Sequence, residues 1–237
     1  MAGGRRVLVI GRASSLTAAL RALADDDWTF ANDACLDPRS ALEVDALFCR
    51  VQPTHVFFVP AGRKTFEGWL DDARAIPNVL DACRRHGVRK SVTVLARFPE
   101  LAERASRLLC RETGRPHVTV SLGEEVFGPG AEDGDVAAMI RTACSCTSLG
   151  VVPGSSRRCV FSHDAAAVLI RAMDEHDSPE PLFADPPSVR IESLAREVAS
   201  LAGCEYVGVE LDDDAAIRRA LRPGLEITMA DHLVRSA

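Results

Sequence analysis

A chain of 237 residues with 47% hydrophobic side chains is long enough to bury one large core or two smaller ones. Its 28 basic and 34 acidic side chains give a formal net charge of −6 and form no basic stripe, which argues against nucleic acid as a partner. No apolar run approaches the ~20 residues of a membrane-spanning helix, and the first residues lack a signal-peptide core, so we expect a cytoplasmic protein with no membrane partner.

Alternating strand-like and helix-like runs fill the chain up to about residue 130. Strands are predicted at 7–11, 27–33, 54–62, 89–96 and 116–128, and helices at 16–26, 40–51, about 67–86 and 99–114. Gly87 is placed to end the third helix as a C-terminal cap. Apolar strands joined by helices of about ten or more residues predict an α/β fold with a Rossmann-type doubly wound parallel sheet.

Beyond about residue 130 the alternation loosens. The later stretches DVAAMIRTACS, SSRRCVFSHDAAAVLI and PPSVRIESLAREVASLAG read as short strands and helices separated by loops. We therefore expect a Rossmann-type nucleotide-binding domain over 1–130 and a reduced C-terminal, partly helical portion over 131–237.

The eight cysteines are expected to be reduced. Most lie in apolar stretches such as LFCRV and DACRRH, where a thiol packs as a small hydrophobic side chain. Cys144 and Cys146 form a CxC pair with no second pair at ligand spacing, so the sequence predicts no metal site.

Four blocks in one order, VQPTHVFFVPAG, NVLDACRRHGVRKSVTVL, VSLGEEVFGP and SSRRCVFSHDAAAVLI, resemble the GDP-L-fucose synthases of the extended short-chain dehydrogenase/reductase family. The resemblance covers about residues 5 to 175. It implies a dinucleotide-binding fold with a C-terminal substrate side, NADP as the cofactor, and a nucleotide sugar as the ligand.

The first loop departs from the family's GxxGxxG pattern. The matching positions are Gly11, Ser14 and Thr17, of which only the first is glycine. A phosphate could still lie at the helix N-terminus formed by Ser14, Ser15 and Leu16. Thr17 is expected to push this helix away from the first strand.

Two further positions bear on the cofactor. Arg12 could pair with a ribose 2′-phosphate, which would favour NADP, or could be a solvated arginine. The resemblance also places Ala61 in the segment that lines the cofactor. The family's adenine-side Asp is replaced by Cys35, and Asp33 and Asp37 could substitute for it only with a shift of register. The predicted cofactor-binding residues are Gly11, Arg12, Ser14, Ser15, Leu16 and Ala61.

The residues that carry proton transfer in the family are missing. Its catalytic YxxxK pair has no counterpart, because the single tyrosine, Tyr206, has no lysine four residues on. Ala96 and Arg97 replace the family's Ser/Thr–Cys pair, and Asp135 replaces its epimerising His. We therefore predict no catalytic residue.

Several polar residues remain as alternatives. Asp164, next to His163, is expected to be a helix N-cap, and His55 a core histidine. Glu124 and Glu125 are acidic candidates beside the substrate cleft that the resemblance implies. Arg157 and Arg158 match the family's arginine pair, and Arg158 is the predicted substrate-binding residue unless it is a surface arginine.

These observations favour a catalytically degenerate relative of nucleotide-sugar reductases and epimerases that acts as a binding or regulatory protein, with a nucleotide, a nucleotide sugar or another protein as its partner. One alternative is an active NADP-dependent epimerase/reductase of the GDP-4-keto-6-deoxyhexose type with rewired acid–base residues. Another is an NADP sensor without chemistry. The family dimer uses the helix that bears the missing tyrosine, so the oligomeric state stays open.

Overall fold

The computed structural model describes residues 4–32, 34–60, 66–95, 116–152, 154–175, 182–183, 186–208 and 215–236. The chain forms two compact units. The first holds Met1–Ala13, Leu20–Ser121 and Ala166–Ala184, and the second holds Ser14–Ala19, Leu122–Ala165 and Asp185–Ala237. The sequence placed the change of architecture near residue 130. The main part of the first unit instead ends at Ser121, and the unit also includes the later segment Ala166–Ala184.

The first unit is built on a six-stranded sheet in which every strand pairing is parallel. Its strands, in the spatial order β2-β1-β3-β4-β5-β9, are Trp28–Ala31, Val7–Gly11, His55–Val59, Lys90–Leu95, His117–Ser121 and Leu182–Phe183. The central strands carry apolar residues on both faces, and Val7 to Ile10 are at most 1% exposed. Such continuous apolar runs are typical of a parallel sheet covered on both sides. The predicted α/β fold with a parallel sheet is confirmed.

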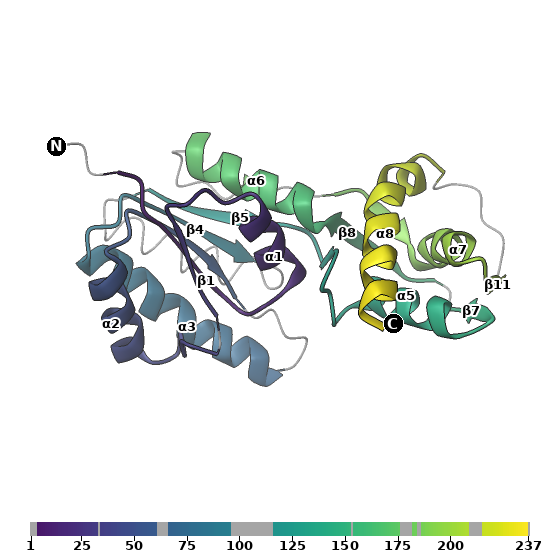
Figure 1. Ribbon diagram of the computed structural model, residues 1–237, viewed down its shortest axis with the longest axis horizontal. Helices are drawn as coiled ribbons and strands as arrows, with labels where there is room; N and C mark the ends of the chain where they lie inside the picture. The colour runs from purple at the N-terminus through teal and green to yellow at the C-terminus, as the bar shows by residue number, and fades with distance from the viewer. Residues whose placement is uncertain are drawn as a thin grey trace. The chain divides into compact units, whose positions relative to one another are not determined.

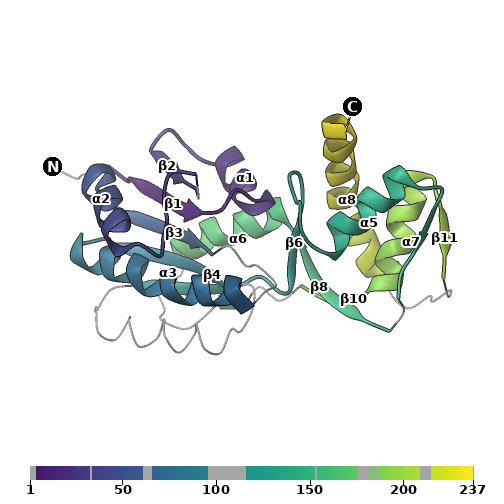
Figure 2. The ribbon, with the colours of Figure 1, turned by 90° about the horizontal axis from the view of Figure 1, so that it is seen from below.

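Helices cover both faces of this sheet. In Figures 1 and 2, α2 (Ala41–Val51) and α3 (Phe66–Arg85) lie on one face, and α6 (Ser162–Glu175) lies on the other. The core between the sheet and helices α2 and α3 includes Ile10, Phe48, Phe58 and Val79. Gly87 follows α3 with φ 71°, so the predicted left-handed cap is confirmed. The helix predicted at 99–114 lies outside the described residues.

The second unit has its own core. Strands β6 (Glu125–Phe127), β8 (Ser156–Phe161) and β10 (Ser188–Arg190) form one small sheet, and β7 (Ser148–Gly150) pairs with β11 (Glu205–Val207). Helices α5 (Asp135–Ser145), α7 (Ile191–Ala202) and α8 (Ala215–Ser236) contribute buried side chains such as Ile140, Leu194 and Leu225. The remaining helix, α1 (Ser15–Ala22), has residues in both units. Within the described ranges, no helix combines the length and the apolar character that a bilayer crossing requires.

The single strand predicted over 116–128 is wrong. The chain leaves the parallel sheet after Ser121, and β6 belongs to a sheet of the second unit. Gly123 makes the break possible because its φ is 80°, and a Cβ at this position would meet the Arg158 carbonyl oxygen at 2.9 Å.

Candidate functional site

A cavity of about 250 Å³ lies at the carboxyl ends of β1, β2 and β3. Strand β1 sits between β2 and β3, so the chain reverses its direction of winding there. Open α/β sheets bind their ligands outside the carboxyl ends of the strands at such a switch point. The cavity lining comes from these strand ends, the loop before α2 and the first half of α3: Ile10, Gly11, Arg12, Ala31, Asn32, Leu36, Asp37, Pro38, Arg39, Phe58, Val59, Pro60, Gly68, Asp71, Asp72 and Ala75.

Gly11 is required by the packing of the strands themselves. It pairs in register with Val59 of β3, and a Cβ on Gly11 would lie 2.6 Å from the Val59 carbonyl oxygen. That oxygen belongs to the backbone of a buried strand and cannot rotate away. The glycine therefore permits close approach of the two strand ends that form the floor of the cavity, whether or not a ligand is bound.

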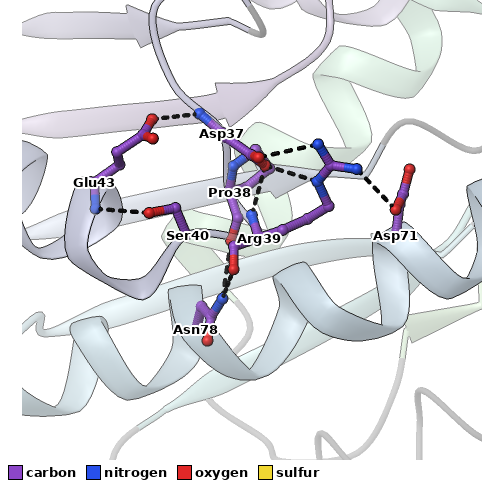
Figure 3. Close-up of polar contacts among 7 residues, drawn as sticks. All are labelled: Asp37, Pro38, Arg39, Ser40, Glu43, Asp71 and Asn78. Atoms are coloured by element: carbon purple, nitrogen blue, oxygen red, sulfur yellow. Dashed lines mark hydrogen bonds and ion pairs between the residues drawn. The ribbon is translucent and has the colours of Figure 1, made fainter.

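An ion-paired network forms the cavity wall between the loop and α3 (Figure 3). The guanidinium of Arg39 donates from Nε to Asp37 Oδ1 at 2.9 Å and from Nη2 to Asp37 Oδ2 at 3.0 Å. Its Nη1 donates to Asp71 Oδ1 at 3.0 Å. The two parallel bonds to Asp37 fix the plane of the guanidinium. Hydrogen bonds from Arg39 lower the pKa of Asp37, so this carboxylate stays ionised.

The backbone of the same loop is held from both sides. Ser40 is the N-cap of α2 and accepts from the Glu43 N–H at 3.3 Å, while Glu43 Oε2 accepts from the Asp37 N–H at 2.9 Å. On the other side, Asn78 of α3 donates to the carbonyl oxygens of Pro38 at 3.2 Å and Arg39 at 2.8 Å. The network is therefore placed by two helices and not by the loop alone.

Charge at the cavity is mixed. Two guanidinium groups, from Arg12 and Arg39, share the lining with the carboxylates of Asp37, Asp71 and Asp72. Carboxylates can accept hydrogen bonds from sugar hydroxyls, and guanidinium groups can bind phosphate. Since Arg39 is paired with the carboxylates of Asp37 and Asp71, a phosphate would have to compete with them for this guanidinium.

Two backbone N–H groups at the N-terminus of α1 donate to side chains of the same segment. The Ser14 N–H donates to Thr17 Oγ1 at 2.9 Å, and the Thr17 N–H donates to Ser14 Oγ at 3.3 Å, the reciprocal pattern of a capping box. These are the positions of the family's second and third glycines. The Ser14 N–H, expected to be open to a phosphate, is engaged within the chain. Ser15 and Leu16 begin the helix as buried residues.

Acidic residues of the second unit hold the start of α5. Both oxygens of the buried Glu125 carboxylate accept backbone N–H groups, from Asp135 at 3.0 Å and from Val136 at 2.9 Å. Asp135 in turn accepts from Arg157 Nε at 2.7 Å. Glu125, considered from sequence as an acidic candidate, therefore acts as the cap of a helix whose N-cap residue, Gly134, has no side chain.

Other predicted residues are not among those that line the cavity. Arg158 is on β8, with its side chain 42% exposed and its Nη2 3.9 Å from Glu124 Oε1. His163 stacks on Phe161 with ring centroids 5.1 Å apart. Asp164, expected as an N-cap, lies instead within the first turn of α6, where its charge still favours the helix dipole. Ala61, Asp33, Ala96 and Arg97 lie outside the described residues.

Among the described residues, the cavity lining includes neither a tyrosine nor a lysine. Tyr206 is on β11 of the second unit. Of the two lysines in the sequence, Lys90 begins β4 at the amino edge of the sheet, opposite the cavity, and Lys64 lies outside the described residues. His55 starts β3 at the same amino edge, and burial lowers the pKa of its ring.

The network residues Arg39, Asp71 and Asn78 were missed from sequence. The spacing of Asp37 and Arg39 carries a local signal, because Asp37 Oδ1 also accepts the Arg39 N–H at 2.9 Å in an Asx turn. Asp71 and Asn78 carry no such signal. They belong to α3 and reach the loop only through the packing of α2 against that helix.

The parallel sheet, its covering helices and the switch-point cavity define a doubly wound α/β fold of the kind that binds nucleotides. No family model matches the chain. Among solved structures, the GDP-L-fucose synthetase from Naegleria fowleri bound to NADP is similar with a TM-score of 0.78 and 16% identity, over 100% of this chain and 95% of that one.

Two more solved structures share this fold. The GDP-mannoheptose C4 reductase from Campylobacter jejuni with NADP bound has a TM-score of 0.79 and 14% identity, over 98% of this chain and 99% of that one. The UDP-glucose 4-epimerase with UDP-glucose from Thermotoga maritima has a TM-score of 0.76 and 14% identity, over 98% and 100%. At these identities the likeness establishes the fold, which agrees with the fold of the family that the sequence resembles.

Proposed function

We propose that this protein binds a nucleotide at the switch-point cavity of its first unit and performs no redox chemistry, acting as a binding or regulatory protein. The observation that carries the proposal is a cavity with paired charges at the carboxyl ends of β1 to β3, in a chain whose single tyrosine has no lysine at YxxxK spacing. The ligand would be NADP or the nucleotide part of a nucleotide sugar.

The cavity chemistry fits the sugar and phosphate portions of such a ligand. Asp71 and Asp72 on α3 can accept hydrogen bonds from ribose hydroxyl groups, and Arg12 at the end of β1 can bind a phosphate. The volume of about 250 Å³ is below the ~300–1,000 Å³ typical of small-molecule pockets, which suits part of a dinucleotide better than the whole. NADP is the preferred candidate because two solved structures of the same fold contain it.

Loss of chemistry follows from the missing proton donor. In the family that the sequence resembles, a tyrosine transfers the carbonyl proton and a lysine lowers its pKa. General acid–base catalysis contributes ~10²–10⁴-fold to a rate. Here desolvation raises the pKa of Tyr206, which opposes the use of this phenol as a proton donor near neutral pH.

Calorimetric titration of the purified protein with NADPH and NADP⁺ tests binding. We expect a dissociation constant below about 100 μM, corresponding to more than ~5.5 kcal/mol of binding free energy. Arg12→Gln should weaken binding at least tenfold, whereas Arg171→Gln, which changes an arginine with a 76% exposed side chain on α6, should not. Absence of binding at millimolar cofactor, or equal affinity of the two variants, would refute the proposed site.

A turnover assay separates the proposal from its alternative. With NADPH and a GDP-4-keto-6-deoxyhexose, we expect no cofactor oxidation above the rate without protein. Turnover that is lost in Arg12→Gln would instead identify an active NADP-dependent epimerase/reductase with rewired acid–base residues. Retained binding without turnover supports the binding or regulatory role.

A further inference from the structure

Three side chains that commonly bind metals meet at the surface of the first unit, between α2 and the end of α3. Asp45 and Cys49 are both on α2 at i and i+4, a spacing that puts them on one face of the helix. His86 directly follows the last residue of α3. An Asp45 carboxylate oxygen, the Cys49 Sγ and a His86 ring nitrogen all lie within 4.8 Å of one another.

The histidine is held in place by its surroundings. Its backbone N–H donates to the Ala82 carbonyl oxygen at 2.9 Å, and its ring packs against the buried Phe48 ring with centroids 5.6 Å apart. Its Nε2 lies 2.7 Å from Asp45 Oδ1. Because this side chain is only 20% exposed and contacts both helices, the ligand atoms face one another without a large loss of side-chain freedom on binding.

We propose that Asp45, Cys49 and His86 form a binding site for a divalent cation of the zinc class, with water as the fourth ligand. A thiolate, an imidazole and a carboxylate are the donors that Zn²⁺ accepts in tetrahedral sites, at ~2.0–2.3 Å from the metal. Such geometry separates ligand atoms by about 3.4–3.7 Å. The hydrogen bond between Asp45 and His86 would therefore open by less than about 1 Å, and the Cys49 thiol would release its proton to solvent.

One neighbouring cation competes for the site. Arg85 Nη1 lies 2.5 Å from Asp45 Oδ1, and Arg85 Nε lies 2.9 Å from Asp81 Oδ2. On metal binding, Arg85 would give up Asp45 and keep Asp81. Removing the guanidinium should therefore strengthen binding, a change opposite in sign to that caused by removing a ligand.

The bound cation would join α2 to the end of α3. Both positions lie near the amino edge of the sheet, because α3 leads directly into β4 through Gly87. The cavity lies at the carboxyl edge, so this site is separate from the proposed nucleotide site. Its consequence is stabilisation of the first unit by metal, which increases with the free metal concentration.

Titration of the purified full chain with Co²⁺, followed by displacement with Zn²⁺, tests the site. We expect visible absorption bands of tetrahedral Co²⁺ and a near-ultraviolet thiolate-to-Co²⁺ band. Cys49→Ser should abolish the thiolate band and weaken binding at least tenfold. Cys146→Ser, which changes an exposed cysteine of the second unit, should leave both unchanged. Arg85→Gln should tighten binding.

Each outcome either supports the metal site or overturns it. Loss of the thiolate band in Cys49→Ser together with tighter binding by Arg85→Gln supports the site. Absence of any thiolate band in the wild type, or an equal band in Cys49→Ser, overturns it, as does weaker binding by Arg85→Gln. Circular dichroism of each variant without metal establishes that the fold is intact, so a lost band reports on the ligand and not on unfolding.

Discussion

His117 at the start of β5 should make the stability of the protein depend on pH between 7 and 5. The side chain is 5% exposed, and its Nδ1 lies 2.7 Å from the Ser91 hydroxyl of β4. Burial lowers the pKa of the ring from 6.5 to about 4. The folded protein thus keeps the ring neutral at pH 5, where the unfolded chain binds a proton.

The sign and size of the effect follow from linkage. The stabilising contribution of neutral His117 is complete above pH 6.5 and is lost progressively as the pH falls towards about 4. Each pKa unit corresponds to ~1.4 kcal/mol. From pH 6.5 down to pH 5, a span of about 1.5 pH units, the unfolded ring is protonated and the folded ring is not. The free energy of unfolding should therefore fall by roughly 2 kcal/mol between pH 7 and pH 5. Carboxylates contribute little in this window because they titrate mainly below it, whereas His55, whose pKa burial also lowers, adds a loss of the same sign.

Urea denaturation at pH 7 and pH 5 measures this loss. In His117→Gln the ~2 kcal/mol that His117 contributes should disappear, because the substituted amide does not titrate and any packing cost is equal at both pH values. Ser91→Ala serves as the matched control. It removes the hydrogen-bond partner, which costs ~1 kcal/mol at both pH values, but keeps the pH dependence. If His117→Gln loses as much free energy of unfolding between pH 7 and pH 5 as the wild type does, the reasoning about the buried neutral ring is wrong.

Substitutions at three further positions test the geometry within each of the two units. Gly11→Ala should lower the free energy of unfolding by ~1–3 kcal/mol in urea, because its Cβ would meet the Val59 carbonyl at 2.6 Å; an unchanged midpoint would contradict this close approach. Glu125→Gln should cost ~1–3 kcal/mol by turning an amide donor towards the N–H groups that begin α5, and a neutral result would remove its capping role. Ser40→Ala should cost ~0.5–2 kcal/mol in a thermal melt, whereas Ser40→Gly should cost only a few tenths.

The fold could be predicted well where the signal is local. The apolar runs around Val9 and Phe57 identify central strands, and Gly87 marks the end of α3. The break at Gly123 could not be seen, because LGEEVF continues the strand-like pattern and only its contact with the Arg158 carbonyl, 35 residues on, requires the turn. Such a contact depends on tertiary packing, which residue pattern alone does not report.

The candidate site likewise contains some residues that a local sequence pattern indicates and others that only tertiary packing brings together. Gly11 and Arg12 were identified because they follow directly from the end of the first strand. The ion pair of Arg39 with Asp71 joins residues 32 positions apart and exists because α3 packs beside the loop. The pairing of Ser14 with Thr17 is local, and its spacing is that of an N-cap and its N3 partner. Side chains that replace two glycines can therefore be interpreted as a helix cap before any ligand is considered.

The return of Ala166–Ala184 to the first unit sets the order in which a new chain can fold. A nascent chain that ends at Ser121 has five strands of the sheet, but β5 lacks its neighbour β9, whose Leu182 pairs with Val120. The edge of β5 stays unpaired, and the sheet face that α6 covers stays exposed, until about 60 more residues are made. This takes several seconds at ~5–20 residues per second. During synthesis the first unit is therefore completed late, and a chaperone that shields apolar surface would act longest on this part of the chain.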